Sequence, residues 1–167
     1  MPGTWAHLAR RFFWTLGAPD LTAAEYDTLA EVLTAPQFEL FCQQPGPDRR
    51  HGYQTMMAVS AATGDTEMLR AAALHDVGKR HAGLGVLGRS MASLLAKLRL
   101  PTPGRYGRYL DHGQIGADEL AAVRSSALVV HFTKHHHGSR PDSVDEPTWN
   151  LLQAADGEVV GRSQAAR

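Results

Sequence analysis

The spacing of the apolar residues is the feature that most constrains how this chain folds. Apolar positions recur every three or four residues in several segments, as in the sets Tyr26, Leu29, Val32, Leu33 and Met91, Leu94, Leu95, Leu98. This spacing is typical of helices that bury one face, whereas a half-buried strand alternates with a period of two. Only residues 127–132 compete as a strand, because Val129 and Val130 are β-branched. The sequence therefore predicts an all-α protein.

Caps and helix breakers divide the chain into about six to eight expected helices. Thr22 and Glu25 have the spacing of a capping box, and Pro36 is expected to end the helix that they begin. Asp65 is expected to cap a helix that runs to about residue 77 and is closed by Gly78. The other expected helices cover residues 49–63, 113–124, 126–136 and 147–156, with a further apolar stripe at 91–98.

Composition bounds the class of protein. The chain has 167 residues, of which 43% are apolar and 20% charged, and these values fit one globular domain with one core. The 17 basic and 17 acidic side chains balance, so bulk binding to nucleic acid is not expected. A single cysteine excludes an internal disulfide and predicts the reducing cytoplasm. No run approaches the roughly 20 apolar residues of a transmembrane segment.

The N-terminal segment has an apolar face of its own. On one side of a helix it would collect Trp5, Leu8, Phe12, Phe13 and Leu16. Such a face predicts packing on the domain or on a partner, and a homodimer is one such arrangement. Contact with a membrane surface is the alternative interpretation.

Histidine is over-represented, with nine residues spread along the chain. Histidine in excess indicates metal or proton chemistry. His75 and Asp76 are adjacent near the end of an apolar helix, where a buried carboxylate needs a partner such as a metal ion. Further candidate ligands fall at or near expected helix ends, which can converge in a bundle: His51, His112, His135, His136, His137 and Asp156.

The segments around these candidates resemble the HD-domain superfamily of metal-dependent phosphohydrolases. Residues 48–53 (DRRHGY) are similar to the segment around its first histidine, residues 69–79 (LRAAALHDVGK) to its HDxGK helix, and residues 151–156 (LLQAAD) to its closing segment. The resemblance implies a single-domain helical bundle with a central metal site over residues 38–160. A helical extension over 1–37 would pack on this core, and residues 161–167 would form a tail.

The resemblance also implies a set of metal ligands. Single-metal members use positions that correspond to His51, His75, Asp76 and Asp156. Two-metal members add intervening histidines, which correspond here to His112 and to His135 or His136, and we favour this two-metal interpretation. Of the three consecutive histidines, His136 is preferred, His135 comes second, and His137 is expected in solvent. The implied cofactors are two divalent ions, with iron or manganese favoured over magnesium, nickel or zinc.

A basic segment lies between the expected ligands. No acidic residue occurs between Asp76 and Asp111, but seven basic residues do: Lys79, Arg80, Arg89, Lys97, Arg99, Arg105 and Arg108. In the family, the lysine of the HDxxK pattern contacts phosphate, which implies catalytic roles for Asp76 and Lys79. We expect Lys79, Arg80, Arg105 and Arg108 to bind the phosphate of a small phosphorylated, nucleotide-like substrate. A merely solvated basic face is the alternative.

The leading functional hypothesis is a metal-dependent phosphohydrolase. In the two-metal site that the resemblance implies, Asp76 would bridge both ions, and a bridging water acidified to hydroxide would attack the phosphorus of a phosphate ester or anhydride. Family members of this kind cleave cyclic di-GMP or diadenosine tetraphosphate, but residues 138–141 (GSRP) depart from the Gly-Tyr-Pro signature of the former. The alternatives are a di-iron oxygenase of the same fold, which uses the same ligand types, and a non-catalytic nucleotide-sensing module.

Overall fold

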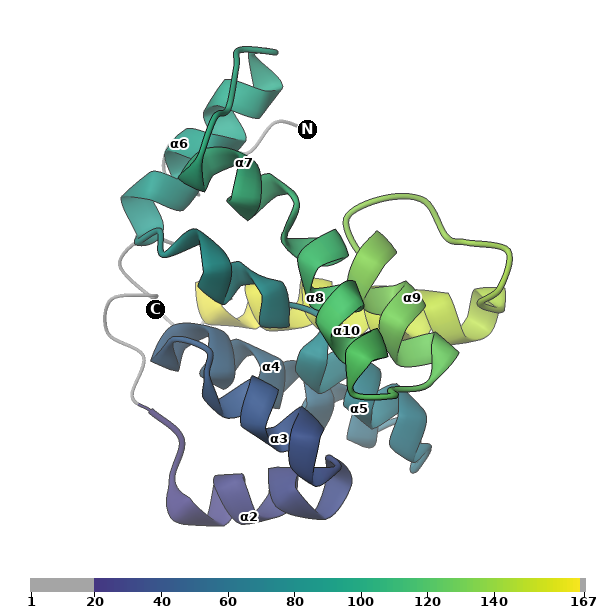
Figure 1. Ribbon diagram of the computed structural model, residues 1–167. Coiled ribbons are helices and arrows are strands. Elements are labelled where there is room, and N and C mark those ends of the chain that lie inside the picture. Colours follow the sequence, from purple (N-terminus) through teal and green to yellow (C-terminus); the bar gives the residue numbers. More distant parts are fainter. Residues whose placement is uncertain (1–19, 166–167) are drawn as a thin grey trace.

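A computed structural model describes residues 20–165. Every regular element in this range is helical, which confirms the predicted all-α class (Figure 1). The elements in chain order are α2 (Ala23–Val32), α3 (Ala35–Cys42), α4 (Gly46–Ser60), α5 (Thr66–Leu74), the 3-10 helix η1 (Val77–Ala82), α6 (Val86–Lys97), α7 (Arg105–Leu110), α8 (His112–Ala122), α9 (Ala127–His135) and α10 (Glu146–Ala165). Residues 127–132 lie in α9, so the alternative of a strand there is wrong. The apolar face expected at residues 5–16 lies outside the described residues.

α5 is the central helix of the bundle. It packs against α4, α9 and α10, and also contacts α2 and α3. Its last four residues, Ala71 to Leu74, are all buried, and three of them are alanines, which allow neighbouring helices to approach closely. At Gly52 of α4, an added Cβ would lie 2.5 Å from the carbonyl oxygen of Ala73. This close packing holds the end of α5 in the middle of the molecule, surrounded by the large buried side chains Phe41, Met56, Leu120, Phe132 and Leu152.

Two of the expected caps are confirmed, and one expected helix end is wrong. Thr22 and Glu25 form the capping box of α2. The Asp65 carboxylate caps α5 by accepting hydrogen bonds from the backbone N–H groups of residues 67 and 68. Pro36, however, does not end α2, which already stops at Val32. It lies in the first turn of α3, a helix that the sequence did not predict, where proline is tolerated because the first turn needs no N–H donor.

The chain tightens after α5 instead of continuing as one helix to residue 77. α5 ends at Leu74, His75 is its C-cap, and η1 follows. Gly78 therefore does not close a helix; that role falls to Gly83, whose φ of 56° is left-handed. The expected divisions of the chain at residues 37 and 160 fall inside α3 and α10, so both helices run across them.

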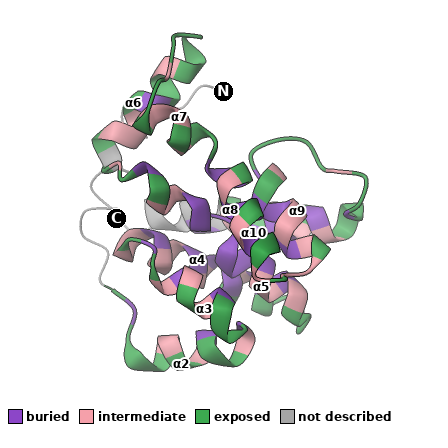
Figure 2. Cartoon of the chain, in the orientation of Figure 1, coloured by how far each residue is buried: buried purple, intermediate pink, exposed green. Residues whose placement is uncertain are grey.

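α6 and α7 project from the rest of the molecule (Figure 1). α6 packs chiefly on α7, and α7 packs on η1 and α8. We call residues 86–110 the arm. Much of its surface is exposed, in contrast to α5 and α9 (Figure 2). Across residues 20–165, no helix combines the length and the apolar character that crossing a membrane requires.

Candidate metal centre

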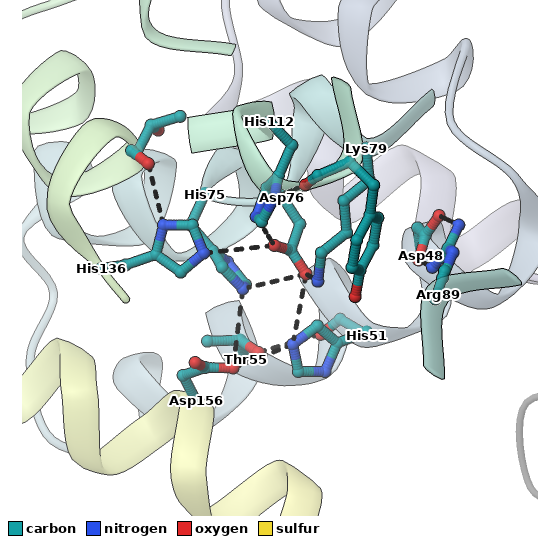
Figure 3. A network of polar contacts seen from close by, with 12 residues as sticks. Asp48, His51, Thr55, His75, Asp76, Lys79, Arg89, His112, His136 and Asp156 are labelled. Atoms are coloured by element: carbon teal, nitrogen blue, oxygen red, sulfur yellow. Dashed lines mark hydrogen bonds and ion pairs between the residues drawn. The ribbon is translucent and has the colours of Figure 1, made fainter. Parts of the chain in front are cut away.

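Five parts of the chain bring histidine and aspartate side chains to one place, around the end of α5 (Figure 3). His51 comes from α4 and Asp156 from α10, while His112 is the first residue of α8. His75 and Asp76 follow α5, and His136 follows α9. Six of the seven residues expected as ligands are therefore brought together.

The Asp76 carboxylate lies at the centre of this group and faces it with both oxygens. Oδ1 is 3.4 Å from Nε2 of His112 and 3.3 Å from Nε2 of His136. Oδ2 is 3.4 Å from Nε2 of His75 and 3.8 Å from Nε2 of His51. One buried carboxylate thus divides the histidines into two sets.

Each set has a further member. Asp156 joins the first, because its Oδ1 is 2.9 Å from Nε2 of His51 and 3.5 Å from Nε2 of His75. His137 joins the second, since its ligand nitrogen lies within 4.8 Å of those of the other members. We call His51, His75 and Asp156 the first half-site, and His112, His136 and His137 the second. Asp76 is shared by both.

Backbone carbonyls at helix ends orient three of these rings. Nδ1 of His75, His112 and His136 lies 2.6–2.8 Å from the carbonyl oxygen three residues earlier, at Ala72, Tyr109 and Thr133 respectively. Each of these carbonyls lies in the last turn of a helix, where it has no intrahelical partner. Because a carbonyl only accepts, Nδ1 must donate, and a neutral ring then directs the lone pair of Nε2 toward Asp76. This arrangement is typical of histidines that bind metals.

The second half-site contains buried polar atoms that no described group satisfies. Asp76 Oδ1, His112 Nε2 and His136 Nε2 are buried and have no hydrogen-bond partner. All three are acceptors when the rings are neutral, so they cannot satisfy one another, whereas one shared cation would satisfy them all. Two ligands about 2.1 Å from one ion are roughly 3.0–3.4 Å apart at octahedral or tetrahedral angles. The 3.3 and 3.4 Å separations agree with this, so the residues fit a metal ion.

The ionisation states of the carboxylates and of His136 also suit metal binding. Burial acts to raise the pKa of Asp76, but the ammonium of Lys79 and the ring of His75 outweigh it and hold that pKa well below its usual range. Burial likewise acts to raise the pKa of Asp156, but His75 and His51 lower it. Desolvation lowers the pKa of His136. At neutral pH both carboxylates are therefore ionised and His136 is neutral, which are the forms that bind metals.

His75 is different because it lies between two carboxylates. Burial alone would lower its pKa, but the negative charges of Asp76 and Asp156 outweigh this effect and raise the pKa to about 10. In the metal-free protein the His75 ring is therefore protonated on both nitrogens at neutral pH. The proton on Nε2 lies between the carboxylates of Asp76 and Asp156. Metal binding must displace it, because only the neutral ring is a ligand.

The histidine run at the end of α9 contributes different residues from those expected. His136 joins the centre as predicted, but the structure does not bring His135 to either group. His137 joins the second half-site instead. It is exposed, as expected, yet the centroid of its ring lies 3.9 Å from that of His136 and 5.1 Å from that of His112. Desolvation of the ring, followed by the neighbouring His136 and Lys79, lowers the pKa of His137 to about 3. Successive helical residues differ by about 100° in direction, so counting along the sequence could not separate the three.

Of the four residues expected to bind phosphate, only Lys79 contacts the centre. Its ammonium binds Asp76 Oδ2. Arg80 instead binds Glu119 of α8 at 2.5 Å and the carbonyl of Val77. Arg105 binds the carbonyls of Ala82 and Gly83, and Arg108 is exposed. Glu119 lies outside the basic segment, so the absence of acidic residues within that segment does not leave Arg80 unpaired.

Two further contacts near the centre were not predicted. Asp48 is buried in the first turn of α4 and accepts two hydrogen bonds from Arg89, at 2.5 and 2.6 Å. The Tyr109 ring stacks on His112, with 5.7 Å between ring centroids, and lies 6.0 Å from the guanidinium of Arg89. These contacts connect both helices of the arm to helices that carry candidate ligands.

The second half-site borders a small cavity of about 210 Å³. Its lining comes from residues 110–114 and 134–137, which include all three histidines of that half-site. Access to the centre from this side is therefore available to water or to one small group.

Comparisons with protein-family models, with curated proteins and with solved structures found no match to this chain.

Proposed function

We propose that this protein is a metal-dependent phosphohydrolase with a two-metal centre that cleaves an ester or anhydride bond in a small, nucleotide-like phosphate compound. The observation that carries the proposal is the position of Asp76, whose two oxygens each face a separate set of nitrogen and oxygen donors. Two-metal hydrolytic centres are built around such a shared carboxylate, and bound ions supply Lewis acidity and acidify water.

The donor set suggests which ions bind. It consists of imidazoles and carboxylates, with no thiolate; the lone cysteine, Cys42, is not a member of either group. Such donors suit iron or manganese, and they also accept magnesium, nickel or zinc. In this proposal the first half-site would hold one ion and the second half-site the other, with Asp76 belonging to both.

Lys79 supports phosphoryl chemistry over other uses of the same donors. Burial acts to lower its pKa, but the carboxylate of Asp76 outweighs this effect and raises it, so the side chain stays charged. A fixed positive charge beside the shared carboxylate can receive a phosphoryl oxygen and stabilise the charge that grows on it in the transition state. Lys79 would thus hold and orient the substrate, while Asp76 orients the metals.

The test combines metal loading with substrate turnover. Protein purified without oxygen and loaded with Mn²⁺ or Fe²⁺ should release product from bis-(p-nitrophenyl) phosphate or from a dinucleotide polyphosphate. Asp76→Asn should lose metal and turnover together. Lys79→Met should keep both metals but lose at least tenfold in kcat/KM, whereas the matched change Lys97→Met, at an exposed lysine of α6, should have no effect.

Two results would contradict the proposal. Iron-loaded protein that consumes oxygen with a phosphonate or polyol, but releases no phosphate from any compound in a broad panel, would identify an oxygenase. Nucleotide binding without turnover in fully metal-loaded protein would identify a sensing module.

A further inference from the structure

The large exposed apolar side chains gather in the arm. Of the seven that the described residues contain, six lie between residues 87 and 110. Their exposed fractions run from 38% for Leu94 and Leu110 to 73% for Leu87. The seventh, Met57, is on α4. A concentration of this kind marks a surface that meets another apolar phase.

On α6 these side chains form one stripe. Leu87, Met91, Leu94 and Leu98 follow each other at intervals of four, three and four residues, which place them on one side of a helix. Ala92, a buried residue of α6, points about 100° or more away from all four. Because all four side chains are exposed, the stripe is an outer face of the arm.

The same arm carries unbalanced positive charge. From residue 77 to residue 110 there is no acidic side chain. Lys79, Arg80 and Arg89 are paired with carboxylates elsewhere in the fold. Four further basic residues are exposed and form no ion pair within the described part of the chain: Lys97, Arg99, Arg105 and Arg108.

We propose that the outer face of the arm docks on an anionic lipid surface. An apolar helical face with basic residues beside it is the pattern of helices that lie in a membrane interface, where leucine enters the acyl boundary and lysine or arginine meets lipid phosphate. The positive charge of the arm argues against a second copy of the chain or its own N-terminal segment on this face. A second copy of the arm would bring two basic surfaces together, and residues 1–19 carry Arg10 and Arg11 but no acidic side chain.

Docking of this kind goes beyond the proposed catalytic function and does not depend on it. The arm lies between two ligand-bearing elements, since Arg89 binds Asp48 one turn before His51 and Tyr109 stacks on His112. A bilayer contacted by the outer face would therefore leave the centre intact and hold it close to the membrane surface.

The experiment is flotation of the full-length protein with vesicles. The protein should float with equimolar phosphatidylcholine and phosphatidylglycerol but not with phosphatidylcholine alone, and high salt should weaken the binding. Lys97→Gln should weaken binding about fivefold, the effect of one basic residue near an anionic surface. Arg124→Gln, which removes the same charge from an exposed position after α8, should leave binding unchanged.

A second pair of variants tests the apolar stripe. Leu87→Gln combined with Met91→Gln should reduce vesicle binding at least tenfold. Met57→Gln, at 41% exposure on α4, is the matched control and should bind as the wild type does. Circular dichroism and the melting temperature should be unchanged in all of these variants, because each altered side chain is exposed.

Several outcomes would overturn the proposal. The proposal is wrong if the protein does not bind anionic vesicles, if the arm variants do not reduce that binding, or if neutral and anionic vesicles bind equally well. A monomer produced from a wild-type dimer by the Leu87→Gln and Met91→Gln changes would assign the face to a second copy. A lower melting temperature in that variant would show that the face packs against the chain itself, and salt-sensitive capture of an acidic protein without vesicle binding would assign it to a protein partner.

Discussion

Replacing Gly78 by alanine should separate the two elements that carry Asp76 and His112. A Cβ at position 78 would lie 2.0 Å from the carbonyl oxygen of His112 and 2.7 Å from the backbone nitrogen of Gly116. Ordinary contact begins at 3.4 Å, so η1 and α8 must move apart by about 1.4 Å, which is 3.4 minus 2.0. Both obstructing atoms belong to the backbone, and they cannot rotate away as a side chain can.

This displacement is large on the scale of the centre. Asp76 Oδ1 and His112 Nε2 are 3.4 Å apart, and a full transfer of the shift would take them to about 4.8 Å. Two ligands about 2.1 Å from one ion can be at most roughly 4.2 Å apart. The second half-site should therefore lose its metal. Overpacking against backbone should cost about 3 kcal/mol of unfolding free energy, which lowers Tm by roughly 6–12 °C in a domain of this size.

Calorimetry and metal analysis test this prediction together. Gly116→Ala should be milder, because the nearest atoms there are 3.0–3.1 Å away and include two methyl groups. Gly64→Ala, with nothing within 4 Å, is the control and should keep both stability and metal. If Gly78→Ala has the Tm and the two-metal content of the Gly64→Ala control, the close approach of η1 and α8 does not position the centre.

Three further predictions concern the ligands and the arm. His137→Ala should weaken binding of the second Mn²⁺ at least tenfold in isothermal titration, and His135→Ala should change it less than twofold; the reverse order would return His135 to the centre. Metal added to apoprotein at pH 7.5 should release a proton from His75, which calorimetry in buffers of different ionisation enthalpy can measure. Without metal, the contribution of His75 to the free energy of unfolding should be complete below its unfolded pKa of 6.5 and lost as the pH rises through about 10. Arg89→Met should leave Asp48 buried without its partner and lower the unfolding free energy by about 3 kcal/mol, whereas an unchanged denaturation midpoint would mean that the pair adds nothing.

Local rules predicted most of the helices because each rule acts within a few residues. The capping box of Thr22 and Glu25 and the cap at Asp65 are contacts between near neighbours in the chain. The same rules failed at Pro36, where proline is compatible both with the end of one helix and with the first turn of the next. They also failed at Gly78, whose role is set by α8 more than thirty positions away in sequence.

The sequence predicted which residue types form the candidate site better than it predicted which histidines of residues 135–137 and which basic side chains take part. Six of the seven expected ligands meet because the helices converge around α5. Asp156, expected at a helix end, lies in the middle of α10 instead. The preference for His135 over His137 was not supported, because the ring directions depend on how α9 ends. Arg80 was not available for a substrate because Glu119 of another helix binds it.

The sequence by itself determined the helical class, most of the helix positions and the supply of histidine and carboxylate donors. These follow from periodicity and from caps, which depend only on residues a few positions apart. The tertiary structure alone decided which donors share the Asp76 carboxylate, which basic side chains remain unpaired and which glycine lies at a close crossing. Each of these depends on distances between helices, and such distances arise only when the packed core places residues that are far apart in sequence next to one another.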